Sequence, residues 1–158
     1  MRIGSDASRV RRRCRRIVAA LDIPEPFEVE GFLARLAAAR GRPLELLPVA
    51  AGADVPCGLL VSTDSADYIF HPADAVPLHA RHIVFHEVGH LLGDHGGGSA
   101  APVLFPDLSP ELVRRVLGRT TYSDAQEREA EILATLIARR VLAARRPPRP
   151  GLDSIFEG

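Results

Sequence analysis

Two histidines stand about one helical turn apart in the segment His86-Glu87-Val88-Gly89-His90. An α-helix repeats about every 3.6 residues, so both imidazoles leave the same face of a helix. The carboxylate of Glu87 is rotated by about 100° from His86 and therefore lies beside the pair. Apolar neighbours make this helix amphipathic, and Gly89 allows another backbone to come close. The segment predicts a partly buried helix over residues 78–94 that packs against other elements.

The residue types in this segment are those of a zinc centre. Two neutral imidazoles suit Zn²⁺, and a carboxylate beside them can take a proton from a metal-bound water. Without a metal, a buried His-Glu-His group would leave polar atoms unsatisfied at a cost in free energy. We therefore expect His86 and His90 to be zinc ligands and Glu87 to be the catalytic base.

A zinc site needs further ligands, and a third histidine of the metzincin kind is absent. That pattern requires histidine at position 96, which is Gly96, so His95 falls one residue short. The class also needs a methionine below the metal, and Met1 is the only methionine. The sequence excludes the metzincin arrangement on both counts.

Acidic residues of the last predicted helix offer another source of ligands. At about 100° per residue, Glu127 and Glu131 lie on one flank of the apolar stripe, and Glu129 lies toward the opposite flank. Glu127, nearer the centre of the stripe, is a candidate buried ligand, and Glu131 can support a ligating histidine through its second ring nitrogen. The alternative is an acidic first turn favoured by the helix dipole. Geometry alone leaves these two interpretations open.

The pattern of apolar residues predicts a single α+β domain over residues 1–146. Residues 1–22 contain a basic N-terminal helix, and residues 147–158 are expected to be a disordered tail. Helices are predicted at residues 5–21, 28–40, 78–94, 109–118 and 123–146. Strands are predicted at residues 43–49, 58–62 and 67–70, in a small antiparallel or mixed sheet.

Composition restricts the setting more than the function. The formal net charge is zero, so bulk charge favours no nucleic-acid partner. Only Cys14 and Cys57 are present, which favours a reducing cytoplasm over a disulfide-stabilised secreted protein. We see no signal peptide and no apolar run of about 20 residues, so we expect a cytoplasmic protein without a membrane span. The Arg9–Arg16 cluster indicates either a solvated helix face or a contact with an acidic partner.

The histidine motif and the acidic motif together resemble the motifs of a known family. The run His-Glu-x-Gly-His-Leu-Leu-Gly-x-His, followed by Glu-x-Glu-Ala-x-x-x-Ala, is similar to ImmA/IrrE-type metallo-endopeptidases. These bacterial zincin-like proteins often cleave or act on helix-turn-helix repressors that control stress or mobile-element genes. The resemblance covers roughly residues 58–143 and implies Glu127 as the third ligand. The family usually has Asn in place of Glu131 and Phe in place of Leu133.

The resemblance implies a zincin-like fold and a zinc endopeptidase that acts on a protein substrate, expected to be a helix-turn-helix transcriptional repressor. Tyr122 is the first candidate to donate a hydrogen bond to the oxyanion, followed by His95 and Tyr68. His79 and His82 extend the histidine face and are expected to be solvated or to support the ligands. Two alternatives stay open: a zinc-bound regulatory module that sequesters a transcription factor without cleaving it, and a hydrolase of another substrate.

Overall fold

The computed structural model describes residues 3–50, 58–63, 65–95 and 122–145. Within these ranges the chain forms four helices and three strands, so the α+β class is confirmed. In chain order they are α1 (Ile3–Ala19), α2 (Val29–Arg40), β1 (Leu44–Val49), β2 (Leu59–Ser62), β3 (Asp67–Pro72), α3 (Pro77–Leu92) and α5 (Asp124–Ala144). The helix predicted at 109–118, Cys57 and the tail at 147–158 lie outside the described residues. No described helix is long and apolar enough to cross a membrane.

The sheet is mixed, with β3 between the other two strands. β1 runs parallel to β3, with Leu44 opposite Asp67, whereas β2 runs antiparallel to it, with Leu59 opposite Phe70. The central strand carries the fully buried Ile69, and α3 covers this strand. The prediction of an antiparallel or mixed sheet is thus narrowed to the mixed form.

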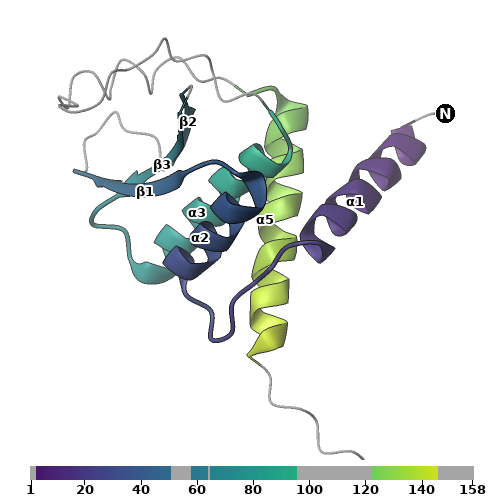
Figure 1. Ribbon diagram of the computed structural model, residues 1–158. Helices are drawn as coiled ribbons and strands as arrows, with labels where there is room; N and C mark the ends of the chain where they lie inside the picture. The colour runs from purple at the N-terminus through teal and green to yellow at the C-terminus, as the bar shows by residue number, and fades with distance from the viewer. Residues whose placement is uncertain (1–2, 51–57, 64, 96–121, 146–158) are drawn as a thin grey trace, which may run out of the picture.

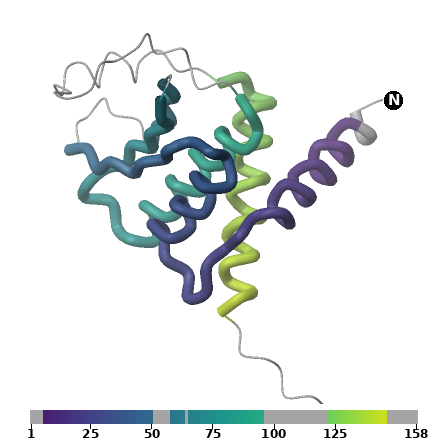
Figure 2. The backbone as a smooth tube through the Cα atoms, in the orientation of Figure 1, coloured from purple at the N-terminus to yellow at the C-terminus, as the bar shows by residue number. Residues whose placement is uncertain are grey.

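The helices stack outward from the sheet (Figure 1). α2 lies against β1, α3 covers β2 and β3, α5 packs on α3, and α1 packs on α5. The tube in Figure 2 shows α1 at the margin, on the side of α5 away from the sheet. Phe27, Phe32 and Phe85 fill the space between α2 and α3 with ring centroids 5.7–6.2 Å apart. Truncating a buried phenylalanine of this kind costs about 3–5 kcal/mol.

Local signals in the sequence place the ends of α2 and α5. Gly41 follows α2 with φ 63°, the left-handed conformation that glycine adopts without steric cost. Ser123 caps α5: its hydroxyl accepts from the Gln126 backbone N–H, and the Gln126 side chain accepts from the Ser123 N–H. This reciprocal capping box satisfies two N–H groups that a helix start leaves without partners. Both ends agree with the predicted boundaries.

α3 ends in a turn that reverses the chain. The N–H of His95 bonds to the carbonyl of His90, and the N–H of Asp94 bonds to the carbonyl of Leu91. These two bonds are those of a Schellman motif, whose left-handed residue is Asp94, with φ 53°. Gly93, the residue that follows the last helical residue Leu92, remains right-handed. As a result, His95 turns back toward the helix that precedes it.

α3 and α5 touch at their backbones. A Cβ atom on Gly89 would lie 2.6 Å from the carbonyl oxygen of Ala130, a distance that real Cβ contacts do not reach. The close approach expected from Gly89 is therefore present, and its partner is α5. This contact brings the face of α3 that carries His86 and His90 against the first turns of α5.

Candidate metal centre

Three side chains that can bind a metal converge between α3 and α5. The Nε2 atoms of His86 and His90 lie 3.2 Å apart. Glu127 brings one carboxylate oxygen to 3.2 Å from His86 Nε2 and the other to 3.5 Å from His90 Nε2. Each residue offers one donor atom to the cluster, and these atoms can hold a metal ion.

The spacing of the donors matches the size of a zinc ion. Nitrogen and oxygen ligands lie about 2.0–2.2 Å from zinc, so neighbouring ligands of a tetrahedral ion are about 3.3–3.5 Å apart. The two Nε2 atoms, 3.2 Å apart, are close to this range, and each is 3.2–3.5 Å from a different oxygen of the Glu127 carboxylate; with one donor atom taken from each residue, the three atoms lie within 4.8 Å of one another. Two histidines and one carboxylate also form a ligand set that catalytic zinc sites use, with a fourth position open.

Hydrogen bonds on the far side of each ring direct the histidine lone pairs into the cluster. His86 Nδ1 lies 3.4 Å from Glu131 Oε2, and His90 Nδ1 lies 3.0 Å from His95 Nδ1. A ring that donates through Nδ1–H is unprotonated at Nε2 when it is neutral. Burial, followed by the nearby His86 and His95, lowers the pKa of His90 to about 3. His90 is thus neutral at physiological pH, as a metal ligand must be.

Glu127 is more exposed than the sequence predicted. Its side chain is 47% exposed, whereas its place beside the apolar stripe suggested a buried ligand. The reason is its position in the first turn of α5. Glu127 comes before Ala130, the residue at which the buried part of the apolar stripe begins. A carboxylate there can reach the histidines while one side stays in solvent.

Glu131 and the two earlier histidines of α3 lie at the outer edge of the cluster. The Glu131 carboxylate reaches His86 Nδ1 and lies 3.9 Å from His82 Nε2. His79 and His82 are exposed, and His82 adjoins Glu131 rather than the donors. Glu131 therefore lies beside the second ring nitrogen of His86, the candidate ligand that the sequence suggested it would support.

Glu87 lies on the sheet side of α3, buried against β2. Burial, and after it the charge of Glu127, raises the pKa of Glu87 from 4.5 to about 8, although a hydrogen bond from the Leu60 backbone opposes the shift. Gly58 leaves room for this carboxyl group, because a Cβ at that position would lie 2.8 Å from Glu87 Oε1. A group with a pKa near 8 can both accept and release a proton near neutral pH.

Tyr122 covers the cluster from the side of α5. Its ring stacks on the His90 imidazole with centroids 3.6 Å apart and planes 13° from parallel. The buried hydroxyl has no hydrogen-bond partner among the described residues. Burial, Glu87 and Glu127, in that order, raise its pKa, so the hydroxyl keeps its proton and remains a donor. Tyr68, the third candidate donor, lies in the central strand β3 instead.

Sequence reasoning missed a second group of polar side chains behind His90. His95 Nε2 lies 3.1 Å from Glu129 Oε2, and Glu129 Oε1 lies 2.6 Å from Arg13 Nη1. Periodicity had placed Glu129 on the flank away from Glu127 and gave it no role. The signal for this group was Arg13 beside the buried Cys14, because a buried residue on α1 brings its neighbour against α5.

Comparisons with known proteins do not assign a family to the chain. No family model matches it, no curated protein matches it, and no solved structure matches it. The α+β architecture and the donor cluster therefore rest on the geometry described above. The zincin-like fold and the ImmA/IrrE resemblance stay predictions.

Proposed function

We propose that this chain is a zinc endopeptidase of the ImmA/IrrE type with a zincin-like fold. The observation that carries the proposal is the spacing of His86 Nε2, His90 Nε2 and the Glu127 carboxylate, 3.2–3.5 Å apart. A buried carboxyl group, Glu87, and a buried hydroxyl without a partner, that of Tyr122, adjoin the same cluster. A base and a donor beside a three-donor site are the groups that hydrolysis of a peptide bond requires.

The fit of zinc to this site rests on the donors themselves. The two Nε2 atoms and the Glu127 carboxylate direct their lone pairs at one place, and no described cation lies there to compensate them. A bound metal ion would satisfy these lone pairs, so it is favoured over an empty cluster. His86, His90 and Glu127 would hold the ion. When bound, zinc would act as a Lewis acid that activates water and polarises the peptide carbonyl.

The residues around the cluster have separable roles in the proposed reaction. Glu87 accepts a proton from the attacking water and passes it to the nitrogen of the leaving amine. The hydroxyl of Tyr122 donates a hydrogen bond to the carbonyl oxygen as negative charge develops on it. The stacking of Tyr122 on His90 limits the freedom of that ring, so the donor is oriented before substrate binds.

The first experiment measures metal and cleavage together. The purified chain is expected to hold about one zinc ion, because it has one three-donor cluster among its described residues. Glu87→Gln should keep the zinc and lose cleavage of the substrate, whereas Glu127→Ala should lose both. The substrate to try is any helix-turn-helix regulator that is encoded next to this chain, a choice that rests on the resemblance. Full cleavage by Glu87→Gln would exclude the proposed base.

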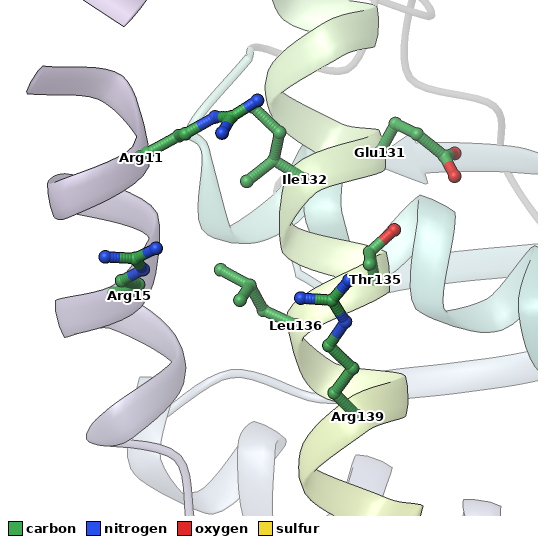
Figure 3. A pocket seen from close by; sticks show the side chains of 7 residues that line it. All are labelled: Arg11, Arg15, Glu131, Ile132, Thr135, Leu136 and Arg139. Atoms are coloured by element: carbon green, nitrogen blue, oxygen red, sulfur yellow. The ribbon is translucent and has the colours of Figure 1, made fainter. Parts of the chain in front are cut away.

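A groove between α1 and α5 favours a second candidate function (Figure 3). Its volume is about 220 Å³. Three arginines and two apolar side chains form most of its wall, and none of the arginines has an ion-pair partner among the residues that the structure describes. We call it the arginine groove; it is lined by Arg11, Arg15, Glu131, Ile132, Thr135, Leu136 and Arg139.

The second candidate is a zinc-bound module that sequesters a transcription factor without cutting it. The arginine groove supports it because unpaired guanidinium groups attract acidic protein surfaces. Neutralising Arg11, Arg15 and Arg139 together should then release a bound regulator that stays intact in the presence of zinc. Arg9 and Arg12, exposed on α1 but outside the groove, are the matched control. Cleavage of the regulator by the unmodified chain would rule out this candidate in favour of the first.

A further inference from the structure

The turn after α3 places one imidazole directly behind another. Because Asp94 is left-handed, His95 folds back, and its Nδ1 atom comes to 3.0 Å from Nδ1 of His90. The Nε2 atom of His90 faces the donors of the metal cluster, so Nδ1 carries the proton. His90 is then the donor in this bond and His95 Nδ1 the acceptor. His95 cannot bind the same ion, because its acceptor atom is occupied by this bond.

The direction of the hydrogen bonds continues outward without conflict. With its Nδ1 accepting, His95 carries its proton on Nε2 and donates it to Glu129 Oε2 at 3.1 Å. The other carboxylate oxygen of Glu129 accepts from Arg13 Nη1 at 2.6 Å. Every bond thus has one donor and one acceptor, from the metal ligand on α3 to the guanidinium on α1. We call His95, Glu129 and Arg13 the His95 network.

The inner part of this network is closed to water. The side chains of His90, His95 and Glu129 are 1%, 4% and 12% exposed. A lost partner there is not replaced by solvent, so the remaining polar group is left unsatisfied. Arg13, by contrast, is 48% exposed, and water can take over part of its role.

The backbone at Gly93 is shaped around His95. A Cβ atom on Gly93 would lie 2.3 Å from Nε2 of His95, so no other residue fits without moving the imidazole. Arg13 also donates from Nη2 to the Gly93 carbonyl at 3.3 Å. α1 therefore contacts both the carboxylate and the turn that hold His95.

We propose that His95 is a positioning residue for the metal ligand His90, and that Glu129 and Arg13 hold His95 in place. His95 fixes the rotation of the His90 ring, with Nε2 directed at the ion, and increases the basicity of that nitrogen. Packing of α1 on α5 then contributes to the affinity of the site for zinc. This inference rests on the proposed function only in needing zinc at the donors; it does not depend on proteolysis or on the substrate.

The main test compares zinc affinities of the full chain by competition with a chelator. His95→Ala should weaken zinc binding about 10–100-fold, the usual effect of removing the hydrogen-bond partner of a ligating histidine. His95→Asn places a carbonyl oxygen where Nδ1 stood and should recover much of this loss. The matched control is His79→Ala, which removes an exposed histidine of α3 and should change affinity by less than about threefold. An unchanged affinity in His95→Ala would overturn the proposal.

A second variant leaves His95 in the chain but displaces it. Gly93→Ala should push the imidazole away from Glu129 and should weaken zinc binding in the same direction as His95→Ala. In the unmodified zinc-loaded protein, the His90 Nδ1 proton should be visible by NMR and slow to exchange with water. In both variants it should exchange faster, a readout that a purely packing role for His95 would leave unchanged. Slow exchange in both would overturn the proposal.

The outer step is tested with two neighbouring arginines. Arg13→Ala should weaken zinc binding by less than about tenfold, because Arg13 is half exposed. Arg12→Ala, the matched control on the same helix, should have no effect. Glu129→Arg combined with Arg13→Glu keeps opposite charges at the two positions, but an arginine at position 129 cannot accept a hydrogen bond from His95. This double variant should therefore not restore zinc affinity. Full restoration would show that charge pairing alone matters. A chain that binds zinc with these dependences but cleaves nothing would retain the proposal and exclude the peptidase.

Discussion

The two histidines of the motif differ in what lies behind them. His86 is 25% exposed, and its Nδ1 faces Glu131, a carboxylate that is itself 53% exposed. His90 is almost fully buried, and its Nδ1 faces His95, which is backed by Glu129. The sequence presents the pair as equivalent, since both lie on one face of one helix. The difference arises from the elements that cover each side of that face.

This contrast indicates which side of the site tolerates substitution of its residues. A hydrogen bond at the surface contributes about 0–1 kcal/mol, because water replaces a missing partner. Loss of one partner from a buried pair costs about 1–3 kcal/mol, because the other partner stays unsatisfied. We therefore expect the His86 side to be permissive and the His90 side to be strict.

The largest expected effect is removal of the ligands themselves. His86→Ala and His90→Ala should each weaken zinc binding more than about 100-fold, beyond the usual effect of losing a ligand's hydrogen-bond partner. Only His90→Ala should also destabilise the metal-free protein, by about 2–3 kcal/mol, since it leaves a buried space and an unpaired His95. Chelator competition and urea unfolding of the metal-free variants measure the two effects. Equal destabilisation by both substitutions would contradict the contrast.

A smaller effect is expected at the turn that directs His95. Asp94→Gly should stabilise the metal-free protein by about 0.5–1 kcal/mol, because a left-handed residue with a side chain is strained and the greater unfolded-state entropy of glycine offsets only part of that gain. The zinc affinity should not change, since the fold of the turn is kept. Thermal unfolding and chelator competition on the same samples provide the check. Weaker zinc binding would mean that the Asp94 side chain itself holds the turn.

On the permissive side, Glu131→Gln should weaken zinc binding by no more than about fivefold, or about 1 kcal/mol. The amide oxygen still accepts from His86 Nδ1, and solvent reaches both groups. The measurement is the same chelator competition, run beside His95→Ala. A loss as large as that of His95→Ala would make the two histidines equivalent after all.

The smallest effect is expected at Cys14, which lies 3.9 Å from Glu129 on the strict side. Burial, followed by the Glu129 charge, raises the pKa of this thiol above its usual 9.0. The unfolded thiol therefore ionises at lower pH than the folded one, so raising the pH above about 9 favours unfolding. In a Cys57→Ser background, Cys14→Ala should flatten this decline. Urea unfolding at about pH 8 and about pH 10 compares the variants; parallel declines would mean that the folded thiol ionises normally.

Helical periodicity predicted which side chains share a helix face, but it left the role of Glu127 open. It put His86 and His90 on one face, and it set Glu127 and Glu131 on the opposite flank of α5 from Glu129. Periodicity describes the faces of one element and not which distant element covers them. For this reason it did not reveal that α1 pairs with Glu129. The expectation that Glu127 would be buried was wrong for a related reason. The pattern of apolar residues does not show where along the helix the covering element ends.

Turn geometry was a further limit of the sequence. Glycine is the residue expected in a left-handed helix end, yet the left-handed residue here is Asp94 and not the neighbouring Gly93. The glycine is needed instead for the space beside His95. Similarly, the three short apolar runs were recognisable as strands, but their order in the sheet depends on long-range pairing that no local pattern contains.

Because Gly89 has no side chain beyond a hydrogen atom, α3 and α5 can approach closely at Ala130, and this approach determines the spacing of the donors. The glycine immediately precedes His90, and the alanine lies one turn after Glu127, so the point where the two rods touch sits beside the donors. A methyl group at position 89 would push α3 and α5 apart and increase the distance between the Glu127 carboxylate and the two imidazoles. A cluster sized for a small ion would then widen toward the dimensions of a larger one. We therefore expect the preference of the site for one metal ion over another to depend on position 89, which is not itself one of the donor residues.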